Sequence, residues 1–122
     1  MEELQKRLQQ LSEEYQKLQT ELESTVEARQ KLESQLQENR NVQQEFNSLD
    51  PDANIYKLVG PVLLKQDKSE AVMAVEGRLN FIEKEIQRIE SQIKEINEKS
   101  EKKRTEILQL QTQAQAAASA SA

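Results

Sequence analysis

The chain has 122 residues, of which 35% are apolar, 3% aromatic and 32% charged, too little apolar material for a compact globular core. Its net charge is −5 with both signs mixed along the sequence, which argues against nucleic acid as a partner, because phosphate binding needs clustered cations. Histidine and cysteine are absent, which excludes imidazole catalysis, thiol nucleophiles, disulfides and all but carboxylate-based metal sites.

The first predicted element is a long helix over residues 2–49. From Leu4 to Asn39, apolar residues recur at alternating steps of four and three, which is the heptad pattern of a coiled coil. The helix should stop near residue 49, because Pro51 disfavours the helical conformation of the residue before it.

Two irregularities interrupt this first heptad pattern. Polar residues occupy the pattern at Thr25 and Arg29, either because a polar site fixes the register of the coiled coil or because the coiled coil tolerates them. Beyond Asn39 the apolar residues shift by one position to Val42, Phe46 and Leu49, which predicts a slip in the phase of the seam.

The connector at residues 55–66 is predicted to be a β-hairpin. Two β-prone runs, 55–59 and 62–66, flank Gly60 and Pro61, which suit the two central positions of a type II′ turn. This register places Leu58 opposite Leu63 and leaves apolar side chains on both faces. A two-stranded hairpin of this kind is not stable alone in water, so we expect hairpins of several chains to join. The predicted assembly residues are Ile55, Tyr56, Leu58, Val59, Gly60, Pro61, Val62, Leu63 and Leu64.

The second predicted helix spans residues 69–115, with an unbroken heptad pattern from Val72 to Leu110. Asp67 is the predicted N-terminal cap of this helix. The basic cluster 102–104 is interpreted as a solvated face near the helix C-terminus, and the Ala/Ser-rich residues 116–122 as a flexible tail.

Two helices of similar length joined by one connector predict a mainly α fold: a long antiparallel two-helix coiled-coil hairpin with one β-hairpin at the bend. Residues 1–122 then form a single domain. Folding back buries the leucine-rich seam of the first helix against the isoleucine-rich seam of the second. A parallel dimer of each helix is the competing arrangement, but it leaves the connector splayed.

The connector also resembles a known family. The stretch YKLVGPVLLKQDKSEA (56–71), the segment RLNFI (78–82) and the segment RQKLESQLQEN (29–39) are similar to the β class of the prefoldin family. Within that class, the turn at 60–62 and the Lys65-Gln66 ending favour the prefoldin subunit 6 family of eukaryotes.

The resemblance implies a heterohexamer of two α-class and four β-class subunits, assembled through their β-hairpins. It further implies an ATP-independent chaperone that holds unfolded proteins, such as actin and tubulin, at the tips of its coiled coils and delivers them to the cytosolic chaperonin. These partners are implied by the resemblance alone.

The two chain ends should meet at the open end of the predicted coiled coil. Apolar residues at a fraying end offer a sequence-tolerant surface for unfolded chains, although the favoured alternative for any one of them is that it only closes the coiled coil. Leu108 is the most suggestive, because it lies beside the heptad seam. The candidate client-binding residues are Leu4, Leu8, Leu11, Ile107, Leu108 and Leu110.

Other functions fit the sequence less well. A structural or tethering coiled-coil subunit shares the heptads but does not explain the apolar connector. The carboxylates of a coiled coil are solvated and lack an enclosing pocket, so we expect no catalysis and no cofactor. No stretch has the apolar length to span a bilayer, the polar face lacks the cation excess of a membrane-surface helix, and the N-terminus does not resemble a secretory signal. We therefore expect a cytoplasmic protein that does not bind membranes.

Overall fold

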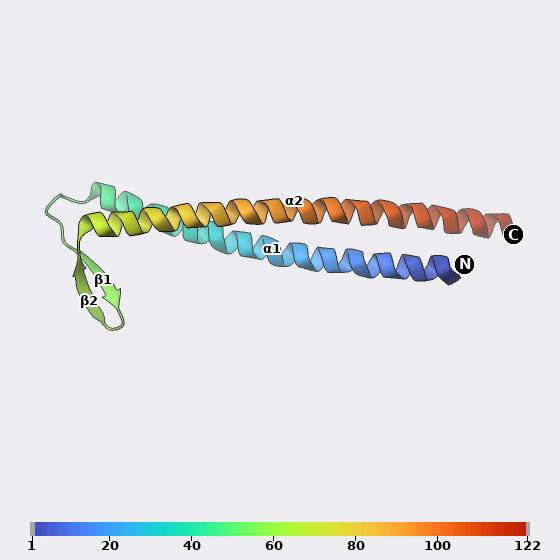
Figure 1. The fold of residues 1–122 in the computed structure, drawn as a ribbon, viewed down its shortest axis with the longest axis horizontal. Helices are drawn as coiled ribbons and strands as arrows, with labels where there is room; N and C mark the ends of the chain where they lie inside the picture. Colours follow the sequence, from blue (N-terminus) through green and yellow to red (C-terminus); the bar gives the residue numbers. More distant parts are fainter. Residues whose placement is uncertain (1, 122) are drawn as a thin grey trace. The chain divides into compact units, whose positions relative to one another are not determined.

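A computed structural model describes residues 2–121, in which a two-stranded sheet lies between two long helices in chain order (Figure 1). In chain order the elements are α1 (Glu2–Ser48), β1 (Ile55–Val59), β2 (Val62–Gln66) and α2 (Lys68–Ser121). The predicted fold class, mainly α with one β-hairpin between two long helices, is confirmed. Within the described residues, neither helix contains a stretch long and apolar enough to cross a membrane.

The described residues form two compact units. The terminal unit comprises the described parts of Met1–Ala28 and Ile89–Ala122, and the hairpin unit is Arg29–Arg88. Each unit contains a segment of α1 and a segment of α2, and the hairpin unit also contains the two strands. In α1 the boundary falls beside Arg29, one of the two polar positions in the heptad seam.

Helix α1 forms because its sequence is dominated by strong helix formers, chiefly leucine, glutamate, glutamine and lysine. It ends at Ser48, one residue before the predicted end and just ahead of Pro51. The chain then turns, and the amide of Ala53 donates a hydrogen bond to the carbonyl of Asp50 at 3.0 Å.

The predicted slip in the seam of α1 is wrong at Val42, whereas Phe46 and Leu49 of the predicted series are partly buried. Gln43 and Phe46 are partly buried, whereas Val42 is 40% exposed. The positions Asn39, Gln43 and Phe46 continue the alternating steps of four and three without a shift. Helix geometry decides which residues face the partner, so the apolar side chain of Val42 points away from the seam and a polar residue takes the seam position.

The β-hairpin matches its predicted strands and register. Strands β1 and β2 pair antiparallel, with Val59 opposite Val62, Leu58 opposite Leu63 and Tyr56 opposite Lys65. Gly60 has a φ of 59°, as the first central position of a type II′ turn requires, and the ring of Pro61 holds φ negative at the second.

Helix α2 begins at Lys68, one residue before the predicted start. Asp67 occupies the N-terminal cap, as predicted, and its carbonyl accepts the amide hydrogen of Ala71 at 3.0 Å. Its carboxylate accepts a hydrogen bond from the hydroxyl of Ser69 at 2.8 Å, which further orders the first turn.

The C-terminal end of α2 differs from the prediction. The helix continues to Ser121, beyond the expected end at residue 115, because alanine has the highest helix propensity of all residues. Of the predicted flexible tail, residues 116–121 are therefore helical, and Ala122 lies outside the described residues. The basic cluster 102–104 is consequently several turns from the helix end, and the expectation that it lies near the C-terminal turn is wrong.

Each unit has its own packed interior along the heptad seams. In the hairpin unit, Leu36 of α1 packs into a cluster of buried residues from α2, and Leu32 and Phe46 extend it from α1. The members from α2 are Val75, Leu79, Ile82 and Ile86. In the terminal unit the buried apolar residues are Leu11, Ile89 and Ile96.

Candidate protein-binding surfaces

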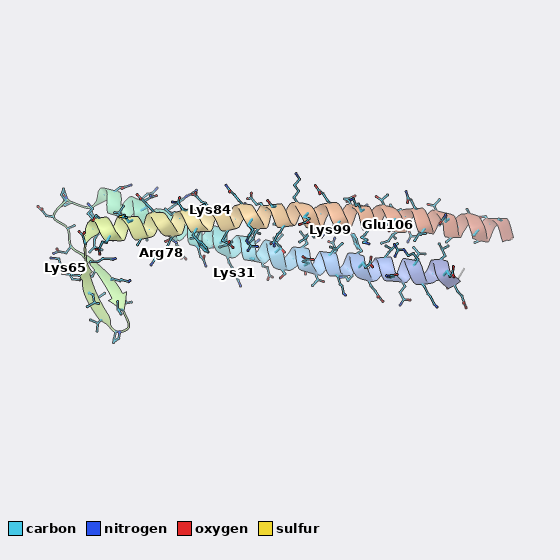
Figure 2. The ribbon with its side chains drawn as sticks, in the orientation of Figure 1. Lys31, Lys65, Arg78, Lys84, Lys99 and Glu106 are labelled. Carbon is cyan, nitrogen blue, oxygen red and sulfur yellow. The ribbon has the colours of Figure 1, made fainter. Side chains whose placement is uncertain are left out.

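The β-hairpin exposes apolar side chains on both of its faces. Leu58 and Leu63 lie opposite each other on one face, and Leu58 is 69% exposed. Lys65 lies on that same face, opposite Tyr56. Figure 2 labels Lys65 on the β-hairpin. The opposite face carries Ile55, Val59, Val62 and Leu64, of which all but Ile55 are classed as exposed. The apolar side chains of the predicted assembly site thus lie on the two faces of one β-hairpin, and most of them are exposed to solvent.

The strand edges add a second reason for the hairpin to bind protein. Within the described residues the sheet contains β1 and β2 alone, so each strand keeps one edge without a neighbouring strand. Unpaired edges of apolar strands are templates for pairing with another chain. Each exposed leucine or valine would contribute on the order of 1.5–3 kcal/mol if a partner covered it fully.

The candidate client-binding residues of the terminal unit do not share one environment. Leu11 is fully buried between the helices, so contact with another chain would require the helices to separate. Leu4, Leu8, Ile107 and Leu110 are partly buried along the seam. These five residues therefore close the coiled coil in this structure, as the alternative interpretation of the sequence expected.

Leu108 differs from the other five, because its side chain lies outside the seam and is 55% exposed. It lines a shallow surface groove together with Leu110 and Ala116 of α2 and Arg7 of α1. Leu108 is the exposed large apolar side chain of this groove, whose polar lining includes Glu106, the ion-pair partner of Arg7.

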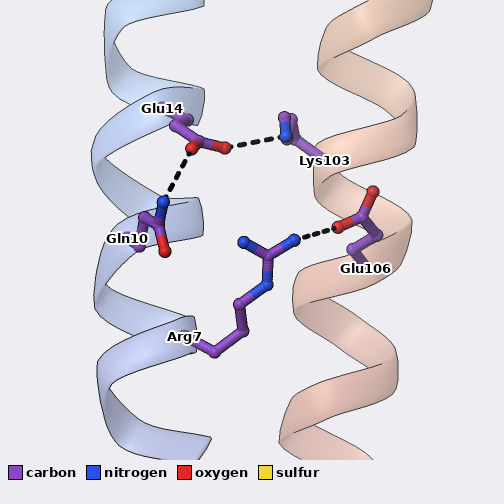
Figure 3. A network of polar contacts seen from close by, with 5 residues as sticks. All are labelled: Arg7, Gln10, Glu14, Lys103 and Glu106. Atoms are coloured by element: carbon purple, nitrogen blue, oxygen red, sulfur yellow. Dashed lines mark hydrogen bonds and ion pairs between the residues drawn. The ribbon is translucent and has the colours of Figure 1, made fainter. Parts of the chain in front are cut away.

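Ion pairs fix the two helices of the terminal unit beside this groove (Figure 3). Lys103 Nζ lies 2.7 Å from Glu14 Oε2, and Gln10 donates a hydrogen bond to the other oxygen of Glu14 at 3.4 Å. Arg7 pairs with Glu106 at 3.4 Å. A higher residue number on α1 pairs with a lower residue number on α2, because Arg7 pairs with Glu106 and Glu14 with Lys103. The two segments are therefore antiparallel.

The hydrogen bond and charge of Lys103 hold the pKa of the Glu14 carboxyl below its ordinary value of 4.5. Farther along the same unit, Ser100 is buried in the seam and accepts a hydrogen bond from Gln19 at 3.5 Å. From the sequence, the cluster that contains Lys103 is interpreted only as a solvated face, so this pairing is not predicted. The heptad spacing does not indicate it, because only the register of α1 against α2 places Glu14 opposite Lys103.

The comparisons with known proteins agree with this architecture. Residues 9–114 match the Prefoldin subunit family. The chain is 45% identical to prefoldin subunit 6 of Homo sapiens over 98% of this chain and 92% of that protein. It is also 45% identical to the probable prefoldin subunit 6 of Caenorhabditis briggsae, over 60% of this chain and 57% of that protein.

A solved structure shows the same fold. The prefoldin beta subunit from Thermococcus strain KS-1 superposes with a TM-score of 0.78 at 29% identity, covering 83% of this chain and 89% of that one. The chain, with its two helices and the β-hairpin between them, therefore belongs to the prefoldin family. The resemblance drawn from the connector, including its likeness to subunit 6 proteins, is confirmed.

Proposed function

We propose that this chain is one subunit of a heterohexameric prefoldin complex, with two α-class and three further β-class subunits as its partners. In that complex it acts in the cytoplasm as an ATP-independent chaperone and performs no catalysis. It holds unfolded proteins, such as actin and tubulin, and delivers them to the cytosolic chaperonin.

The observation that best supports the proposal is the exposed apolar β-hairpin. A tethering coiled-coil protein needs two helices and a turn, but it gains nothing from apolar residues on both faces of the connector. A subunit that completes a shared sheet requires them, because partner strands cover both the faces and the edges.

Assembly is tested by native mass spectrometry of the chain co-expressed with an α-class prefoldin subunit and the other β-class subunits. We expect a hexamer that contains one copy of this chain. A homodimer that ignores those partners would move the function to the tethering alternative.

Client capture is assigned to the terminal unit, with Leu108 as its main exposed contact. In the assembled complex, Leu108→Ser should reduce protection of chemically denatured actin from aggregation, measured by light scattering, while the hexamer stays intact. The exposed leucine-to-serine change leaves the seam unaltered. Gln109→Ser, at the neighbouring position of the same groove, is the matched control and should retain full protection. Full protection by the Leu108 variant would contradict this site.

A further inference from the structure

Helix α2 has a second apolar face in the hairpin unit, separate from its seam. Met73 is 71% exposed and Phe81 is 64% exposed, and the small residues Ala74 and Gly77 lie between them in sequence and are also exposed. Positions 73, 77 and 81 are four residues apart and therefore lie along one side of the helix. We call these four residues the α2 outer strip.

Gly77 has no explanation within its own chain. It lies in a regular helix without a positive φ, and a Cβ built on it would meet nothing within 4 Å. A glycine inside a helix costs about 0.5–1 kcal/mol relative to alanine. The chain thus keeps a destabilising residue where its own packing would accept a larger one.

The surroundings of Gly77 form a groove. Gly77, Ala74 and Phe81 of α2 line it together with Gln35 and Asn39 of α1, which run beside them. Arg78 completes one wall. The groove therefore has an apolar floor at Gly77, an aromatic wall and a cationic rim, all within the hairpin unit.

We propose that the α2 outer strip is a docking surface for a helix of a neighbouring prefoldin subunit, with Gly77 at the point of closest approach. The inference rests on the proposed function, because it assigns a second contact surface to the same assembly. Helices pack with their axes about 8–10 Å apart, and the smaller the residues at the contact, the closer they approach.

The position of the strip explains why the occupant is a neighbouring subunit. Only Asp67 separates β2 from α2, and Met73 lies within the first two turns of the helix. A partner that covers the β-hairpin would therefore lie close to the first turns of α2, and a subunit with this fold would bring a helix of its own to that place.

The chemistry of the strip defines what that helix should present. An aliphatic side chain would fit over Gly77 against the ring of Phe81, and a carboxylate one turn away would meet the guanidinium of Arg78. The exposed thioether of Met73 adapts to irregular neighbours, which suits a surface that different sister subunits could contact.

The test compares two single variants of this chain, each carrying one leucine at one of two adjacent positions and each co-expressed with the other prefoldin subunits. Gly77→Leu fills the groove, whereas Glu76→Leu places the same side chain on another side of the helix and is the matched control. Both isolated chains should keep full helicity, and Gly77→Leu should unfold at the same or a higher temperature than the parent, because leucine favours helix. We expect Gly77→Leu to weaken assembly at least tenfold, measured by dilution of the hexamer in native mass spectrometry, and Glu76→Leu less than twofold.

A second variant, Phe81→Ser, removes the aromatic wall without filling the groove and should also weaken assembly. If the parent chain assembles and both Gly77→Leu and Phe81→Ser assemble as well as the parent, the inference is overturned and the proposed function stands. If the parent chain itself does not assemble with prefoldin subunits, the proposed function fails. Loss of actin protection with unchanged assembly would also overturn the inference, because the strip would then contact clients instead.

Discussion

Placing lysine at the centre of the β-hairpin should separate assembly from folding. Leu58 and Leu63 lie opposite each other and are 69% and 63% exposed, so roughly two thirds of each side chain remains to be covered by a partner. Full burial of a leucine stabilises by about 1.5–3 kcal/mol, so the two uncovered portions together amount to about 2–4 kcal/mol. Since every 1.4 kcal/mol is about tenfold in affinity, the double variant Leu58→Lys and Leu63→Lys should assemble roughly 30- to 700-fold more weakly.

The measurement is the fraction of hexamer in native mass spectrometry as the co-expressed complex is diluted. Helicity by circular dichroism should stay the same, because neither leucine packs in the helical seams. The double variant Asn47→Lys and Asn54→Lys adds the same charge near the hairpin but outside its strands, and it should assemble normally. A hexamer that survives dilution with both hairpin lysines would refute assembly through this surface.

Three further predictions concern the interior, the ion pair and the turn. Leu36→Ala should destabilise the isolated chain by about 2–5 kcal/mol in urea denaturation, whereas Val42→Ala, at a 40% exposed position, should cost far less. In the folded chain the pKa of the Glu14 carboxyl is below its ordinary value of 4.5. Its contribution to folding stability is therefore complete well above pH 4.5, and it is lost as the pH falls below that value through the pKa of the folded state. The parent chain should therefore exceed Glu14→Gln in unfolding temperature at pH 7, and the gap should close in acid; a gap that stays constant would contradict the pairing. Gly60→Ala places a side chain at a φ of 59° and should weaken assembly by about 1–2 kcal/mol, while Gly60→Asn, which tolerates this conformation better, should lose less.

The regular parts of the fold could be predicted from the sequence because each rests on short-range rules. The seam of α2 follows from the spacing of its isoleucines, and the register of the hairpin follows from the Gly60-Pro61 turn, which fixes every pair beyond it. The error at Val42 shows where the rule fails. Hydrophobicity alone assigned Val42 to the seam, whereas the rotation of the helix assigns Gln43.

The contacts between the helices could not be predicted in the same way. Pairing Glu14 with Lys103 requires the register of α1 against α2, which heptads leave undetermined, because any shift by whole heptads keeps both seams apolar. The same limit applies to the candidate client-binding residues. The spacing places Leu11 in the seam and Leu108 beside it, but it does not show that Leu4 and Leu8, at the fraying end, are also partly buried in the packed pair of helices.

The two units leave apolar surface in water to different degrees, and this difference fits two kinds of binding. In the hairpin unit, both faces of the β-hairpin and the α2 outer strip are exposed, an amount of apolar surface that favours permanent burial by partner subunits. In the terminal unit, the exposed large apolar side chains of the described residues are Val26 and Leu108, and polar groups surround them. A surface of that size binds weakly. Weak binding fits the proposed function, because a chaperone that uses no ATP would have to release its client without an energy source, whereas the subunits of the proposed complex would have no need to separate.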